Sequence, residues 1–273
     1  MRRFGLRHFF LRSSYLLWVI LACGCSTQNK KVSNNPVIGV ESAKSIENME
    51  SFYTKCHGRS ISIAKLLDPI VKDMVSQKIL YSPEPSEWRD CSGNFLRLSS
   101  YIAARCPDRA DSLVASAGIE RYRRGVRNKL PGVIKARSSR DIARWYHKQN
   151  RFTPIYYDDA PSKGKPSSSL RANRHRIKVG TVLWFSRKAP KSASGIDNVF
   201  KHINHMAVVT DVKYNSRGEL VKYKMYHGRN KGKLATVTEE HFWAWPLAYL
   251  SRGSEYPPLG YWSQYLVGVG RLL

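Results

Sequence analysis

The hydrophobic pattern of the chain changes its period near residue 177, and this change constrains the fold more than any other feature. Before it, apolar residues recur every three or four positions at 60–80 and again after Cys91, which predicts amphipathic helices. Asp68 and Pro69 interrupt the first of these segments and predict a second helix starting within it. The N-terminal part of the domain is therefore expected to be helical.

After the change, the sequence is rich in β-branched and aromatic residues, which predicts strands at 177–186, 204–214 and 219–227. The last two flank Asn215–Gly218, a turn sequence with glycine where a positive φ costs little, so they predict a β-hairpin. A final strand is expected at the C-terminus, in YLVGVGRLL. Helices followed by an antiparallel sheet define an α+β fold class.

The first 25 residues have the composition of a secretory signal. Four arginines and no acidic residue precede an apolar run at 15–22 that is too short to span a bilayer comfortably. The run ends in Leu-Ala-Cys-Gly-Cys, which resembles a bacterial lipobox, with Cys23 or Cys25 as the lipidated residue. An ordinary cleaved signal peptide is the alternative. Both interpretations predict an exported protein, and the lipobox predicts a membrane-anchored lipoprotein that faces the periplasm or cell wall, on the outer membrane in a Gram-negative cell.

The segment 26–43 is polar and predicts a flexible tether. The remaining residues, 44–273, have the length of one elaborated domain. Within this domain, residues 107–176 are long, basic and mixed in helical and loop character, and we interpret them as an insert. Its last part, 158–176, is rich in Ser, Pro and Lys and predicts a loop.

The chain is strongly basic, with 46 Lys and Arg against 20 Asp and Glu and a net charge of +26. Such an excess attracts polyanions, although a solvated basic face would also account for it. No motif for reading nucleic-acid bases accompanies the charge. For an exported protein we therefore expect anionic envelope polymers as possible partners, and no nucleic acid.

Three of the five cysteines, Cys56, Cys91 and Cys106, lie outside the signal. An odd number in an oxidising compartment leaves one thiol free or paired elsewhere. If Cys56 and Cys106 form a disulfide, Cys91 is the free thiol, but the sequence does not establish that pairing.

The surroundings of Cys91 suit a nucleophile. Asp90 is placed to cap a helix that runs from about 91 to 105, which puts Cys91 in the first turn. Unpaired backbone amides and the helix dipole in that turn favour a thiolate. Gly93 would let a substrate or partner chain approach closely.

Two histidines are placed to complete such a site. His205 begins the apolar strand segment Met206–Val209, and His227 ends the partner strand of the same predicted hairpin. Because the turn is centred near residues 216–217, both histidines lie near its open end. A cysteine nucleophile needs a histidine as base and a third polar group to orient that base.

The sequence DCSG at 90–93 followed by HMAVV at 205–209 and Tyr226-His227 resembles the NlpC-type cell-wall cysteine peptidases. The segment VGTVLWF at 179–185 also resembles a strand of that family, with Thr181 in place of the usual aspartate. The resemblance covers about residues 78–230 and implies a papain-like α+β fold.

The resemblance further implies a triad of Cys91, His205 and His227 that works without a cofactor or metal. Asp90 and Ser92 match positions that help to bind the free amino end of the stem peptide. Tyr81 is a looser match to the family's binding tyrosine, because the glycine pair that follows it in the family is absent here.

The function expected from these features is a peptidoglycan endopeptidase that cleaves stem peptides at the bond between D-glutamate and the diamino acid. Two alternatives are an amidase of the related Cys-His class, which cuts the sugar–peptide link, and a non-catalytic lipoprotein that binds peptidoglycan. A zinc site formed by Cys91, His205 and His227 is a weaker alternative, because no Cys-x-x-Cys spacing is present.

Overall fold

The structure is a computed structural model that describes residues 51–83, 87–112, 138–159, 168–228, 231–241 and 264–273. All of them belong to one compact unit, Gly39–Leu273. The predicted signal, the lipobox and the whole predicted tether lie outside the described residues, as do residues 113–137 and 160–167 of the predicted insert. In the described part of the chain, no helix has the length and apolar character needed to cross a bilayer.

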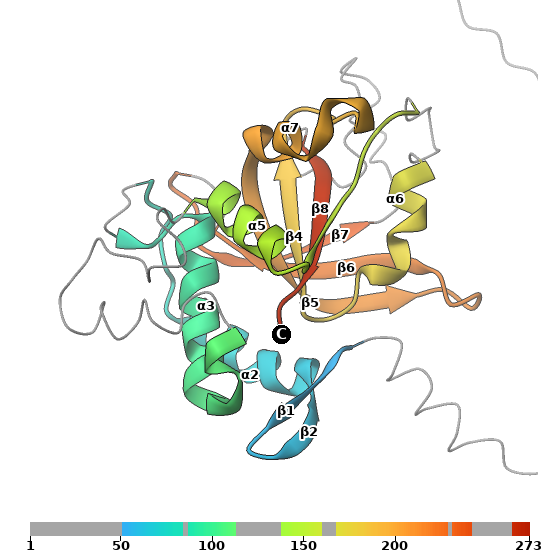
Figure 1. Ribbon diagram of the computed structural model, residues 1–273. Helices are drawn as coiled ribbons and strands as arrows, with labels where there is room; N and C mark the ends of the chain where they lie inside the picture. The colour runs from blue at the N-terminus through green and yellow to red at the C-terminus, as the bar shows by residue number, and fades with distance from the viewer. Residues whose placement is uncertain (1–50, 84–86, 113–137, 160–167, 229–230, 242–263) are drawn as a thin grey trace, which may run out of the picture. The chain divides into compact units, whose positions relative to one another are not determined.

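Helices and strands alternate in a mixed order along the chain (Figure 1). The strands are β1 (Tyr53–Cys56), β2 (Arg59–Ser62), β3 (Phe152–Pro154), β4 (Thr181–Ser186), β5 (Ile203–Tyr214), β6 (Leu220–His227), β7 (Thr236–His241) and β8 (Tyr265–Arg271). The helices are α2 (Ile63–Ser76), α3 (Cys91–Arg105), α5 (Ser139–Lys148), α6 (Ser168–Ala172) and α7 (Gly195–His202), with 3₁₀ turns η2 (Pro107–Ser112), η3 (Arg174–Arg176) and η4 (Ser192–Ser194).

The main sheet has the order β3-β8-β4-β5-β6-β7, and every neighbouring pair is antiparallel. The expected hairpin is confirmed as β5 and β6, and the expected C-terminal strand is confirmed as β8. The strand expected at 177–186 is confirmed as β4, which begins only at Thr181. β1 and β2 form a separate two-stranded sheet. The fold class is α+β, as the change of period predicts.

One face of the main sheet is covered by helices, and Trp184 lies at the contact between this face and α5. Trp184 on β4 is fully buried and lies opposite Met206 on β5, so the two side chains share a face. Tyr146 of α5 meets the Trp184 ring edge-on, with 4.9 Å between ring centroids. On the same face, Tyr226 of β6 reaches α3 through a hydrogen bond to Asn94.

Two local expectations are wrong. The 60–80 segment starts as strand β2 and becomes helix α2 only at Ile63, and α2 continues through Pro69 without a second start. Its apolar stripe is buried on both sides of the proline, which compensates for the backbone hydrogen bond that Pro69 cannot donate. The predicted loop at 158–176 contains α6 and η3, and Leu170 of α6 is fully buried.

Part of the predicted insert is built into the core. α5 buries Ile142, Trp145 and Tyr146, and β3 forms the edge of the main sheet beside β8. The sequence missed this because α5 has a strongly basic exposed face and β3 has only three residues. The described residues from Ser139 to Pro154 are therefore structural.

A disulfide joins Cys56 at the end of β1 to Cys106, the residue that caps the C-terminus of α3. The sequence left this pairing open. The bond closes a loop of 50 residues in sequence, a length at which a cross-link removes substantial entropy from the unfolded chain. It holds the end of α3 against the small β1–β2 sheet.

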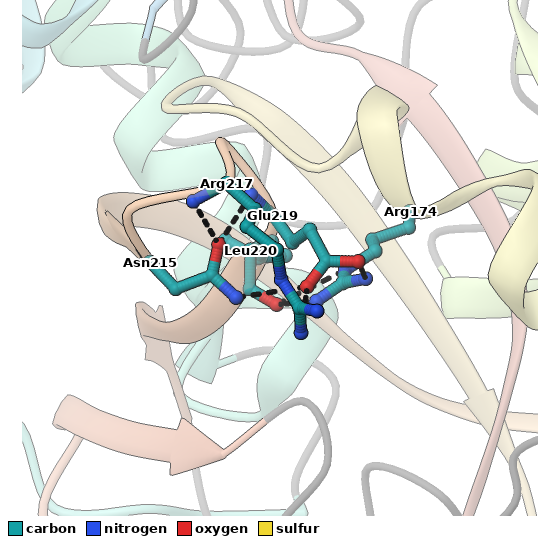
Figure 2. A network of polar contacts seen from close by, with 5 residues as sticks. All are labelled: Arg174, Asn215, Arg217, Glu219 and Leu220. Carbon is teal, nitrogen blue, oxygen red and sulfur yellow. Dashed lines mark hydrogen bonds and ion pairs between the residues drawn. The ribbon is translucent and has the colours of Figure 1, made fainter.

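The turn of the β5–β6 hairpin is fixed by a polar network around Glu219 (Figure 2). The Asn215 side-chain oxygen accepts hydrogen bonds from the backbone amides of Arg217 and Glu219. Arg174 donates two hydrogen bonds to the Leu220 carbonyl, at 2.7 and 3.1 Å, and pairs with Glu219 at 3.2 Å. Arg174 thus ties η3 to the start of β6.

We expect Arg174→Ala to lower the free energy of unfolding by about 1–3 kcal/mol, because it removes charge-assisted hydrogen bonds to a partly buried carbonyl. Arg217→Ala is the matched control. Arg217 pairs with the same Glu219, but its side chain is 80% exposed against 16% for Arg174, so the loss should stay within about 0.5 kcal/mol. Urea denaturation measures both, and equal losses would contradict the assigned role of Arg174.

Candidate active site

Cys91 is the first residue of α3, as the sequence predicts, and Asp90 caps the helix. The Asp90 carboxylate accepts a hydrogen bond from the Gly93 amide at 2.6 Å and another from the Ser92 hydroxyl at 3.1 Å. Both bonds hold the first turn in shape. Asp90 therefore supports the helix that carries the cysteine.

The Cys91 thiol is the free cysteine of the described residues, because Cys56 and Cys106 are joined. It is partly buried and packs against the hydrophobic core. The backbone amide of Met206 in β5 interacts with its sulfur, as do the amides of Cys91 and Ser92. Since Met206 directly follows His205, the sulfur lies beside the strand at the position of the predicted base.

His205 and His227 lie close together near the open end of the hairpin, as counting residues from its turn predicts. Val208 lies opposite Tyr226, so Ala207 and His227 are opposite and His205 is their diagonal neighbour on the same face. The Nε2 atom of His205 is 2.9 Å from Nδ1 of His227, and the two rings are nearly perpendicular. His227 is only 2% exposed, so it cannot turn away into solvent.

A further residue, Thr238 of β7, completes this row of polar groups. Its hydroxyl is 3.0 Å from Nε2 of His227. The strands predicted from the sequence do not include β7, although TVTEEH at 236–241 has the alternation of a strand. The signal was present, but nothing local connected Thr238 with a histidine eleven residues away.

Both contacts fit an assignment of protons that leaves His205 able to act as a base. With the Nε2 proton of His227 donated to Thr238, its Nδ1 accepts from Nε2–H of His205. The Nδ1 atom of His205 is then the unprotonated one. This is the tautomer that a base beside a thiol requires.

The first turn of α3 is anchored to the strand that carries His227. Asn94 is fully buried, and its amide donates to the carbonyls of Arg89 and Asp90 at 3.0 and 2.9 Å. Its oxygen accepts from the Tyr226 hydroxyl at 3.0 Å. At Gly228 a Cβ would lie 2.7 Å from the Asn94 amide nitrogen, so glycine permits this close approach.

Burial controls the titration of both central groups. It raises the pKa of the Cys91 thiol to about 12, with the Asp90 charge adding to the rise, and the amides of Met206 and Ser92 oppose it. Burial lowers the pKa of His205 to about 4, against a smaller opposing effect of Asp90. The expectation of a thiolate stabilised by the helix dipole is therefore wrong for the resting site, because loss of solvation outweighs the dipole. At neutral pH both groups are uncharged.

The predicted substrate-binding residues are placed differently from one another. Asp90 lies beside Cys91, and Ser92 is 1% exposed with its hydroxyl directed to Asp90. Tyr81 is partly exposed, and its backbone amide donates to the carbonyl of Lys233, in the segment between β6 and β7. Gly93 is not open to a substrate. A Cβ there would lie 2.4 Å from the Trp88 backbone, so the chain itself makes the close approach.

No cluster of three or more His, Cys, Asp or Glu in the described part of the chain is arranged to hold a metal ion. The zinc alternative therefore has no support from these residues. Comparison with protein-family models, curated proteins and solved structures finds no match to this chain. The site is thus defined by its motifs and by the geometry given above.

We expect alkylation of Cys91 by iodoacetamide to be slower at pH 7 than that of free cysteine, because the thiol is protonated. The rate should increase about tenfold for each pH unit up to and beyond pH 9. Peptide mass spectrometry measures it, with Cys91→Ala as the blank. A fast rate that is constant between pH 5 and 8 would instead indicate a preformed thiolate–imidazolium pair.

Proposed function

We propose that this protein is an exported peptidoglycan hydrolase, a cysteine endopeptidase of papain-like NlpC type that cleaves stem peptides between D-glutamate and the diamino acid. The observation that carries the proposal is the 2.9 Å contact between His205 and His227 beside a cysteine at a helix N-terminus. A helix start on one side and a central antiparallel strand on the other is the placement that a cysteine–histidine pair needs.

The proposed reaction begins with an uncharged Cys91 thiol and an uncharged His205 imidazole. Nδ1 of His205 removes the thiol proton as the Cys91 sulfur attacks the peptide carbonyl carbon. The tetrahedral adduct collapses, the C–N bond breaks, and the imidazolium returns its proton to the leaving amine. Water, deprotonated by His205, then hydrolyses the thioester, which releases the carboxylic acid and restores the thiol.

His227 acts by orienting and stabilising the base. When His205 takes up the proton, its Nε2–H donates to Nδ1 of His227, which is uncharged and fixed by Thr238. A base whose pKa is lowered by burial to about 4 stays ready to accept a proton at all higher pH values. The part of the pH–activity profile that depends on His205 should therefore rise as the pH increases through about 4, and not through the ordinary pKa of histidine.

The backbone amides at the start of α3 are suited to stabilise an oxyanion. The amides of Cys91 and Ser92 belong to the first turn of α3 and are directed to the sulfur region. An oxygen that becomes negative on the carbon next to the sulfur would be within their reach. The Gly93 amide is not available, because it is bound by Asp90.

The choice of peptidoglycan as substrate rests on the motifs, the predicted export and the basic surface. Stem peptides carry carboxylates, which a chain with a net charge of +26 attracts. In this proposal Asp90 and Tyr81 lie toward the free amino end of the stem peptide, and Ser92 holds the orientation of Asp90. The lipid anchor at Cys23 or Cys25 would keep the enzyme close to the wall.

Digestion of purified sacculi followed by mass spectrometry of the muropeptides tests the function and the bond cut together. We expect new fragments from cleavage after D-glutamate, and their loss by at least about 10³-fold with Cys91→Ala. Cys56→Ser/Cys106→Ser is a control that removes the disulfide and leaves the Cys91 thiol in place. Release of intact stem peptides from the glycan would identify the amidase, and equal results for native protein and Cys91→Ala would favour the non-catalytic lipoprotein.

Thr238 gives a separate test of the histidine row. Thr238→Val should reduce kcat about tenfold, which corresponds to the loss of one hydrogen bond that fixes the His227 tautomer. His227→Ala should reduce kcat by about 10²–10⁴-fold, because His205 then loses its orientation. Thr210→Val makes the same chemical change on β5 and should leave kcat unchanged. A fall in kcat for Thr210→Val equal to that for Thr238→Val would contradict the assigned role.

A further inference from the structure

A pocket of about 570 Å³ lies at the opposite end of β4 from the candidate active site. This volume is in the range of small-ligand sites. Residues of β3, β4 and β8 and of the segment before β4 form its wall. The lining residues are Phe52, Asn150, Arg151, Thr153, His175, Arg176, Lys178, Thr181, Val269, Gly270, Arg271 and Leu273.

The lining is strongly cationic. It includes four positively charged side chains and one histidine, and none of the twelve residues is Asp or Glu. Arg271 donates to the Tyr53 carbonyl at 2.7 Å and stacks over the Phe52 ring at 4.8 Å, and it makes no ion pair with a carboxylate of the described residues. Burial and the neighbouring charges of Arg109 and Arg151 lower the pKa of Arg271. Positive charge is thus concentrated here at an electrostatic cost.

Some of these cations are held in place before any ligand binds. Arg151 donates to the carbonyls of Arg271 and Leu272, both at 2.8 Å, and Lys178 lies 5.9 Å from the centre of the Phe52 ring. Arg176 is exposed at the rim. Fixed guanidinium groups lose less entropy when they bind an anion, so the pocket is preorganised.

The pocket is separate from the candidate active site. Thr181 lies at the start of β4, opposite Arg271, whereas Phe185 lies opposite His205. Thr181 and Phe185 are four residue steps apart along the strand, about 13 Å at the usual rise per residue. Stem-peptide cleavage at Cys91 therefore does not explain the cations of this pocket.

We propose that this pocket binds a phosphate group, either free or as part of a phospholipid head group. Phosphate is favoured over a single carboxylate because it carries more negative charge and offers more oxygens to several cations at once. Guanidinium groups form paired hydrogen bonds with it, and the Thr153 and Thr181 side chains add polar groups to the wall. The site does not depend on the proposed peptidase activity.

Isothermal titration calorimetry with inorganic phosphate, pyrophosphate and citrate tests the ligand class in the purified protein. We expect pyrophosphate to bind most tightly, and Arg176→Gln/Arg271→Gln to weaken its binding by about tenfold or more. Arg59→Gln/Arg187→Gln is the matched control, since it removes the same charge at exposed positions outside the pocket. Arg176→Gln alone, at an exposed position, serves if the double variant does not fold.

Co-sedimentation with phosphatidylglycerol vesicles, against phosphatidylcholine vesicles, distinguishes a lipid source from a free phosphate. Binding that falls with the pocket substitutions and not with the control substitutions supports the proposal in either arm. Equal effects of the two pairs of substitutions would show that only net charge matters and would overturn it. Tighter binding of citrate than of pyrophosphate would overturn the phosphate assignment. Cys91→Ala should bind as the native protein does, whether or not the peptidase activity exists.

Discussion

The hydrogen bond from Tyr226 to Asn94 is the contact on which the candidate site depends. Asn94 is fully buried in the first turn of α3, three residues after Cys91, and Tyr226 directly precedes His227. A single bond between buried polar groups thus connects the helix of the nucleophile with the strand of the orienting histidine. Its loss would leave two buried polar groups without a partner, which costs more than the bond itself contributes.

The other end of α3 is fixed by different chemistry. Cys106 caps the helix and is bonded to Cys56 of β1, so α3 is held by a polar contact at its start and by a covalent bond at its end. A helix held at both ends cannot slide along the sheet. The sulfur therefore stays beside the Met206 amide, and a catalytic pair needs such restriction to a fraction of an ångström.

The sequence was sufficient for features that follow from local pattern. Alternation and a glycine turn located the hairpin, and counting from the turn brought His205 and His227 together. It was insufficient for Thr238 and for the Tyr226–Asn94 contact, because these join segments that only the folded sheet brings close. The sequence also predicted a stabilised Cys91 thiolate, whereas burial raises the pKa of the thiol. The start of a helix can be predicted from a sequence, but the extent of burial around one side chain cannot.

The distribution of charge separates two environments in one small domain. Around Cys91 and His205, burial removes charge: it keeps the thiol protonated and the imidazole neutral, so proton transfer has to coincide with attack on a substrate. At the far end of β4, cations of β8 and the neighbouring segments accumulate in a pocket lining that contains no Asp or Glu side chain. The first arrangement suits covalent chemistry on an uncharged amide bond. The second suits recognition of an anion, and the distance between the two along β4 weakens the effect of its positive charges on His205.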